Sequence, residues 1–166
     1  MRYLLDANIF IQAKNFHYPF DVFPGFWEWM KRDMDAGIIG SVVPVFQELI
    51  NGNDELVTWT KDCEACGCFL NVDDVNTQTK FADIANWATD PVHNFKQTAL
   101  QEFLSVADSW LIAKALSTQA KIVTLEKYDV NCKKRILIPN VCNAFGITYI
   151  NTVDLIRDLG IKFGLQ

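Results

Sequence analysis

The 166-residue chain has few of the residues that mark basic, disordered or low-complexity proteins. It carries 15 Lys and Arg against 20 Asp and Glu, giving a net charge of -5 and a pI near 4.9, which argues against general electrostatic attraction to nucleic acid. Glycine and proline are scarce, with 8 and 5 residues, which argues against intrinsic disorder. Because half of the residues are hydrophobic, we expect a single globular domain over residues 1–166.

Long apolar runs and targeting signals are also missing. No apolar segment approaches the roughly 20 residues that a membrane-spanning helix needs. The N-terminus lacks the basic region, apolar stretch and small-residue cleavage site of a secretory signal. We therefore expect a cytoplasmic protein with no membrane partner.

The five cysteines do not form a recognisable disulfide or zinc framework. Cys63, Cys66 and Cys68 cluster, and their Cys-x-x-Cys part is similar to half of a zinc site, but Cys132 and Cys142 have no histidine nearby to complete it. An odd number of thiols also argues against a closed set of disulfides. We expect reduced and mostly buried thiols.

Several motifs of enzyme chemistry are absent. His17 and His93 are the only histidines, and neither lies beside an acid or a Ser-x-Gly nucleophile motif. No Gly-rich phosphate loop is present. The basic run Lys133-Lys134-Arg135 is most simply a solvated loop.

Strand-like and helix-like segments alternate along the chain, which predicts right-handed βαβ units and an α/β fold with a mostly parallel sheet. The predicted strands are 3–5, 38–43, 69–72, 121–125 and 147–150. The predicted helices are 26–36, a short helix between 44 and 52, 54–64, 77–88, 105–118, 139–145 and 152–159.

Four acids stand out because they follow or adjoin these elements: Asp6, Glu48, Asp108 and Glu126. Asp6 ends the first apolar run, and Glu126 follows the most β-branched strand. Ligands of open α/β sheets bind just beyond the carboxyl ends of the strands. Four acids without a thiolate or histidine set suit Mg²⁺ or Mn²⁺, which prefer carboxylate oxygen and water.

Each acid also has a simpler structural explanation. Asp6 and Asn8 fit an Asx-type turn, and Glu48 fits the solvated face of a short helix. Asp108 lies three residues after Ser105, a spacing typical of a capping box, where the helix dipole would also keep the carboxylate ionised.

The segments that contain the four acids resemble the ordered acidic motifs of the PIN domain family. These segments are 4–11, 48–49, 107–113 and 123–126. The resemblance implies a three-layer α/β/α sandwich with a mostly parallel central sheet. It also implies a Mg²⁺- or Mn²⁺-dependent ribonuclease, of the kind found as toxins of toxin-antitoxin pairs, with RNA as substrate and a protein antitoxin as partner.

By this resemblance, Asp6, Glu48, Asp108 and Glu126 would take the catalytic and metal-ligating positions. Asn8 and Thr124 would orient these ligands. The fourth family position is usually Asp, so the longer Glu126 departs from the pattern, and Asp129 is an alternative fourth acid.

The sequence also allows two other functions. One is a catalytically silent PIN-like module that binds a partner protein. The other is a haloacid-dehalogenase-like phosphatase, but that class needs an Asp two residues after the first one, where this chain has Asn8.

The segment 16–27 is unusually aromatic for a loop. Its rings could stack on single-stranded RNA. The simpler interpretation, which we favour, is that most of them cover the sheet or an oligomer interface such as a homodimer.

Overall fold

Parallel strands form the centre of the molecule. The computed structural model describes residues 1–164, and within that range one five-stranded sheet has the order β3-β2-β1-β4-β5. All neighbouring strands run parallel. The strands are β1 (Tyr3–Leu5), β2 (Ile39–Val42), β3 (Phe69–Leu70), β4 (Lys121–Val123) and β5 (Tyr149–Ile150).

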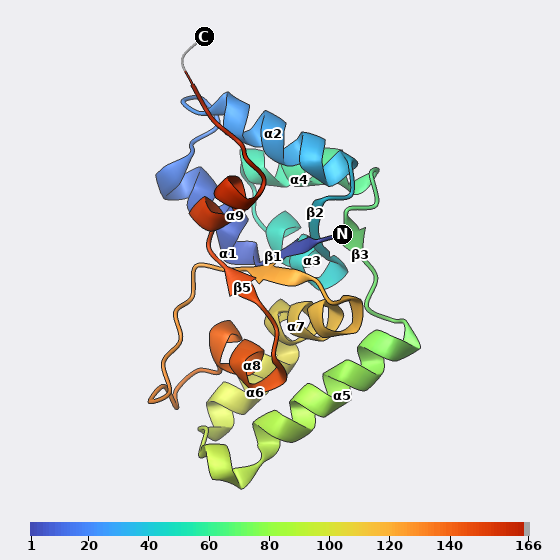
Figure 1. The fold of residues 1–166 in the computed structure, drawn as a ribbon, viewed down its shortest axis with the longest axis vertical. Helices are drawn as coiled ribbons and strands as arrows, with labels where there is room; N and C mark the ends of the chain where they lie inside the picture. Colours follow the sequence, from blue (N-terminus) through green and yellow to red (C-terminus); the bar gives the residue numbers. More distant parts are fainter. Residues whose placement is uncertain (165–166) are drawn as a thin grey trace.

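Helices cover both faces of this sheet, as Figure 1 shows. On one face lie α1 (Ala7–Gln12), α2 (Pro24–Asp35), α4 (Glu55–Glu64) and α9 (Thr152–Asp158). On the other lie α5 (Val75–Thr89), α6 (Gln97–Ser105), α7 (Ala107–Thr118) and α8 (Ile138–Phe145). The helix α3 (Val43–Ile50) follows β2, a π-helical turn (Ala13–His17) follows α1, and a 3-10 turn (Pro91–His93) follows α5. The predicted three-layer α/β architecture is confirmed.

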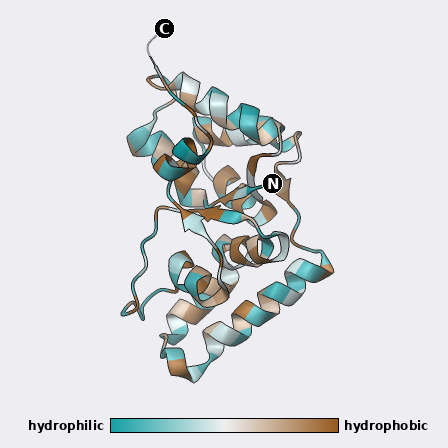
Figure 2. Ribbon diagram, in the orientation of Figure 1, coloured by the Kyte–Doolittle hydropathy of each residue, from teal (hydrophilic) through white to brown (hydrophobic). Residues whose placement is uncertain are grey.

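The core is centred on β1 and α7. Leu4 and Leu5 of β1 and Leu111 and Ile112 of α7 are completely buried. Apolar residues concentrate on the strands, and hydrophilic residues lie on the outward sides of the helices (Figure 2). A buried strand with helices on both faces requires apolar side chains in both directions, which explains the continuous apolar run at the start of the chain. Among helices of residues 1–164, none has the length and apolar character needed to cross a membrane.

The strand order places a topological switch between β1 and β4. From β1 the chain moves outward to β2 and β3, and it then returns across the sheet to β4 on the other side of β1. Open α/β sheets bind ligands at such a switch, beyond the carboxyl ends of the strands. Since α7 leads into the amino end of β4, the first turn of α7 lies at the carboxyl edge, where β1 and β4 also end.

Most predicted elements are confirmed to within a few residues, but the helix predicted for 105–118 is wrong at its start. Ser105 is the last residue of α6, and Val106 takes an extended conformation that separates α6 from α7. No glycine or proline marks this break. The helices α1 and α6 were not predicted, because α1 has only six residues and α6 joins α7 without a turn signal.

The aromatic segment 16–27 is half helical, and most of its rings are packed. Tyr18 stacks on Phe26 with ring centroids 4.1 Å apart, and Phe20 stacks on Trp27 at 3.9 Å. Phe26 and Trp27 are buried, whereas Phe16 is 70% exposed. The prediction that most of these rings cover the core is confirmed, while the expectation of a loop holds only for residues 18–23, between the π-helical turn and α2.

The thiols agree with the prediction of free, mostly buried cysteines. All five are free, and Cys63, Cys68 and Cys142 are buried. The Cys66 and Cys68 thiols both donate hydrogen bonds to the carbonyl of Cys63. Burial raises the pKa of the Cys63 and Cys142 thiols to about 12, so these groups stay protonated and unreactive at neutral pH.

Candidate functional site

Asp6 joins β1 to α1 at the switch point. Its backbone N–H donates to the carbonyl of Val123 at 3.0 Å, which ties it to β4. One carboxylate oxygen accepts from the Thr124 hydroxyl at 3.0 Å, and the other accepts from the Asn8 backbone N–H at 3.4 Å. The residue is 1% exposed. Thr124 therefore fixes the orientation of this carboxylate, whereas Asn8 contributes its backbone and keeps an exposed side chain.

Asp108 lies in the first turn of α7, but it is not part of a capping box. The N-cap is Val106, which makes no side-chain capping hydrogen bond, and the Ser105 hydroxyl donates instead to the carbonyl of Glu102. Within residues 1–164, no group donates a hydrogen bond to the Asp108 carboxylate. The capping explanation is therefore wrong, and this partly buried carboxylate has no structural partner.

The charges of the four predicted acids act on one another and shift the pKa values of Asp6 and Asp108. The pKa of Asp108 is raised to about 7. Burial is the largest cause, and the negative charges of Asp6, Glu126 and Glu48 add to it. Burial likewise raises the pKa of Asp6 to about 6, against the lowering effect of its hydrogen bonds. At Asp108, burial and repulsion from the other acids act against the helix dipole, which favours the ionised carboxylate. Perturbed acids of this kind mark functional sites.

Glu48 contributes the most solvent-accessible of these carboxylates. It lies on the exposed side of α3, the helix that directly follows β2. Partial burial raises its pKa. Its charge acts on both Asp6 and Asp108, so it faces the same edge of the sheet while its side chain remains exposed to solvent.

Glu126 is held by other protein groups. One carboxylate oxygen pairs with Arg135 at 2.8 Å, and the other accepts the backbone N–H of Ile138 at 2.8 Å, at the start of α8. The Glu126 N–H in turn donates to the Thr124 hydroxyl oxygen at 3.2 Å. This residue therefore anchors the segment 124–137 to α8 as well as adding negative charge to the site.

The alternative fourth acid lies elsewhere. Asp129 is exposed, and its carboxylate accepts the backbone N–H of Asn131 at 2.9 Å in a local turn. Its charge is not among those that shift the pKa of Asp6 or Asp108. Of the two candidates for the fourth position, only Glu126 acts on the other acids.

Sequence reasoning missed one residue of the site. Arg135 was interpreted as part of a solvated basic loop, but it pairs with Glu126 and lines a small cavity with Asp108. Its charge lowers the pKa of Asp108. Residues 124–137 form neither helix nor strand, so no periodicity in the sequence could have indicated where this guanidinium points.

We expect Glu126→Ala to destabilise the protein by about 1 to 2 kcal/mol, because it leaves the first N–H of α8 without its acceptor and Arg135 without its partner. Urea unfolding monitored by circular dichroism measures this change. Asp129→Ala is the matched control, since it removes an exposed acid from the same segment. Equal unfolding midpoints for the two variants would contradict the anchoring role.

The acids do not form a closed metal cage. Across the described part of the chain, residues 1–164, no three His, Cys, Asp or Glu side chains gather closely enough to be a ready-made metal-binding group. Mg²⁺ is usually held by one or two carboxylates and several water molecules. The donor set consists only of carboxylate oxygens, on buried Asp6, partly buried Asp108 and exposed Glu48, and it fits a hard divalent cation of that kind.

The comparisons with known proteins give a family but no characterised relative. A family model described as "Domain of unknown function (DUF4411)" matches residues 3–163, which includes all four acids. No curated protein and no solved structure matches the chain.

Proposed function

We propose that this chain, which belongs to the DUF4411 family, is a PIN-like, Mg²⁺- or Mn²⁺-dependent endoribonuclease of the cytoplasm that hydrolyses RNA phosphodiester bonds. The observation that carries the proposal is the Asp108 carboxylate, which is partly buried and lacks a hydrogen-bond donor within residues 1–164, while repulsion from the other acids helps raise its pKa to about 7. A bound cation would offset this repulsion. Arg135 offsets only part of it, since its charge lowers the pKa of Asp108 while its guanidinium is already paired with Glu126.

Asp6, Asp108 and Glu48 are the residues that would hold the cation, and Glu126 would hold the surrounding segment in place. The cation supplies Lewis-acid polarisation of the phosphodiester and lowers the pKa of water. A cation also reconciles an acidic site with a polyanionic substrate, because its charge reverses the local field.

The protein groups around the acids fit the needs of this hydrolysis. Thr124 keeps the Asp6 carboxylate in a single orientation through its hydroxyl. The Arg135 guanidinium is 55% exposed and offers a positive charge to the developing negative charge on phosphate.

Metal-dependent cleavage of RNA tests the proposal directly. Purified protein is incubated with a mixed pool of single-stranded and structured RNAs in Mn²⁺, in Mg²⁺ and with chelator. We expect defined fragments only when the cation is present. Cleavage that survives chelation, or no cleavage of any RNA in the pool, would contradict the assignment.

We expect Asp108→Asn to weaken Mn²⁺ binding about tenfold or more, because the amide keeps the size of the side chain but loses the charge that attracts the ion. Isothermal calorimetry on the folded proteins measures this change. The control is Asp83→Asn, which removes the same charge from the exposed surface of α5, where Asp83 pairs with Lys80. Equal affinity of both variants would remove Asp108 from the ligand set.

One observation favours a second candidate, a catalytically silent PIN-like module that binds a partner protein. Both Glu126 oxygens are occupied by protein groups, which leaves three acids rather than four free for chemistry. If the ribonuclease is the toxin of a toxin-antitoxin pair, its protein antitoxin is expected to place Arg or Lys side chains against the acids. Metal binding without RNA cleavage would favour the module over the enzyme.

A further inference from the structure

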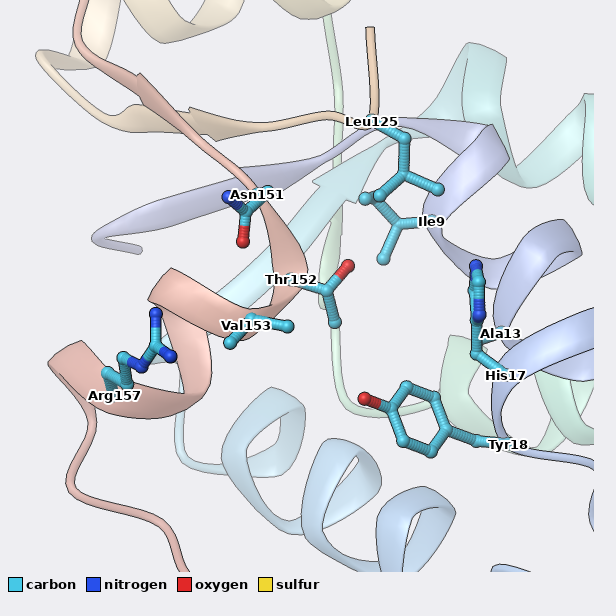
Figure 3. Close-up of a pocket in the computed structure, with 9 residues that line it drawn as sticks. All are labelled: Ile9, Ala13, His17, Tyr18, Leu125, Asn151, Thr152, Val153 and Arg157. Atoms are coloured by element: carbon cyan, nitrogen blue, oxygen red, sulfur yellow. The ribbon is translucent and has the colours of Figure 1, made fainter.

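A cavity of about 310 Å³ lies beside the acidic site, between the π-helical turn after α1 and the start of α9 (Figure 3). It opens at the same carboxyl edge of the sheet. Two of its wall residues show how close it is to the acids: Leu125 lies between Thr124 and Glu126 in the chain, and Ile9 lies one turn of helix after Asp6.

The walls combine apolar surface with polar groups that lack partners. Thr152 is only 8% exposed, and its hydroxyl forms no hydrogen bond with any group of residues 1–164. The Tyr18 hydroxyl is also without a hydrogen-bond partner in that range. Figure 3 shows both hydroxyls directed into the space between the π-helical turn and α9, opposite Ile9 and Leu125. Both hydroxyls are open to the cavity and are available to a ligand without breaking a hydrogen bond within the protein.

The charge of the lining differs from that of the rest of the molecule. The chain has a net charge of -5, yet the cavity is lined by His17 and Arg157 and, among the described residues, by no Asp or Glu. The Arg157 side chain is 73% exposed at the rim. Arg157 pairs with Asp154 at 3.1 Å, so the charges at the rim balance, and the lining itself adds no negative charge that would repel the phosphate of a nucleotide.

We propose that this cavity binds an unpaired nucleobase of the RNA, adjacent to the phosphodiester that the acidic site cleaves. The inference rests on the proposed ribonuclease function and adds a base-recognition site to it. The apolar walls and the Tyr18 ring cover the faces of the base, the Thr152 and Tyr18 hydroxyls meet its polar edge, and Arg157 faces the neighbouring phosphate. Such a site gives the enzyme a preference for particular bases next to the cleaved bond.

Nucleotide titrations followed by NMR test the site without requiring catalysis. The probes are AMP, GMP, CMP and UMP at millimolar concentration, with no metal added. We expect at least one of them to shift the signals of Tyr18, Leu125 and Thr152. Thr152→Val and Tyr18→Phe each remove one hydroxyl with little change in shape and should raise the dissociation constant about five- to tenfold.

The chain offers a matched control. A second cavity, also of about 310 Å³, lies at the opposite, amino edge of the sheet and is lined by Thr148 and Lys121. Thr148→Val removes a threonine hydroxyl from that cavity and should leave nucleotide affinity unchanged. Equal losses in Thr148→Val and Thr152→Val would overturn the assignment.

The outcomes separate this inference from the proposed function. If the protein cleaves RNA with Mn²⁺ but no nucleotide shifts the cavity signals, the base site is wrong and the ribonuclease stands. If a nucleotide shifts those signals and Thr152→Val weakens its binding, the base site is supported, and failure to cleave any RNA then counts against the ribonuclease alone. No shifts together with no cleavage overturn both.

Discussion

Asp6→Asn is expected to lower the rate of metal-dependent RNA cleavage at least about a hundredfold, the usual cost of removing one group that stabilises charge in a transition state. The amide oxygen can still accept the Asn8 N–H, and the amide NH2 can donate to the Thr124 hydroxyl, which donates to the other oxygen of Asp6 in the wild type; asparagine is also a good N-cap for α1. The variant therefore isolates the loss of negative charge from any loss of structure.

The comparison uses wild type, Asp6→Asn and the surface control Asp83→Asn, purified identically and tested on the same RNA pool. Growth of cells that express each variant gives a second measurement, since the proposal that this nuclease is a toxin requires growth arrest only when the acidic site is intact. Cleavage by Asp6→Asn at the rate of wild type would show that a contaminating nuclease or a different mechanism is responsible.

The second large effect is an unusual dependence of stability on pH. Asp6 and Asp108 have folded pKa values of about 6 and about 7, against 3.8 for the ordinary side chain. The folded state therefore binds protons more tightly than the unfolded state between these values, so stability falls as pH rises through this window. Without metal, we expect the free energy of unfolding to increase by about 3 kcal/mol from pH 8 to pH 5.

Below this range the trend should reverse. Asp74 and Asp158 are paired with Lys114 and Lys121, and these contacts lower the pKa of both carboxyls. Their stabilisation is present above the ordinary pKa of aspartate and is lost as pH falls below it. In urea titrations, we expect the free energy of unfolding to be largest at about pH 5.

Asp108→Asn provides the variant for this prediction. At pH 8 without metal it should be more stable than wild type, because it removes a partly buried charge that three other acids repel. Added Mn²⁺ should raise the melting temperature of wild type, more at pH 8 than at pH 5.5, and raise that of the variant much less. If the variant is less stable than wild type at pH 8, the Asp108 carboxylate has a structural role after all.

The parts of the site that depend on strand ends could be predicted from the sequence. Asp6 follows a short apolar run and Glu126 follows a β-branched one, and parallel strands bring such positions to one edge of the sheet. The element alternation that predicts the parallel sheet also places Glu48 just after β2. These positions follow from local patterns, each a few residues long, and from the geometry that all parallel sheets share.

The parts that depend on long-range packing could not be predicted. Ser105 and Asp108 have the spacing of a capping box, but the extended backbone of Val106 separates them, and nothing local in the sequence indicates it. The pairing of Arg135 with Glu126 is made by a segment without regular structure. The cavity lined by Tyr18 and Thr152 joins residues from opposite ends of the chain. Such contacts are set by the tertiary fold rather than by propensity or periodicity.

The central position of β1 has a consequence for the synthesis of this protein. The hydrogen bond between Thr124 and Asp6 spans 118 residues, and β1 cannot complete its pairing until β4 has emerged from the ribosome. Contacts this far apart in sequence form late in folding. The first acid of the site is made at the start of translation, but the strand that β1 pairs with on this side, β4 (Lys121–Val123), is made about three quarters of the way along the 166-residue chain. The candidate site is therefore assembled only late in the synthesis of the chain.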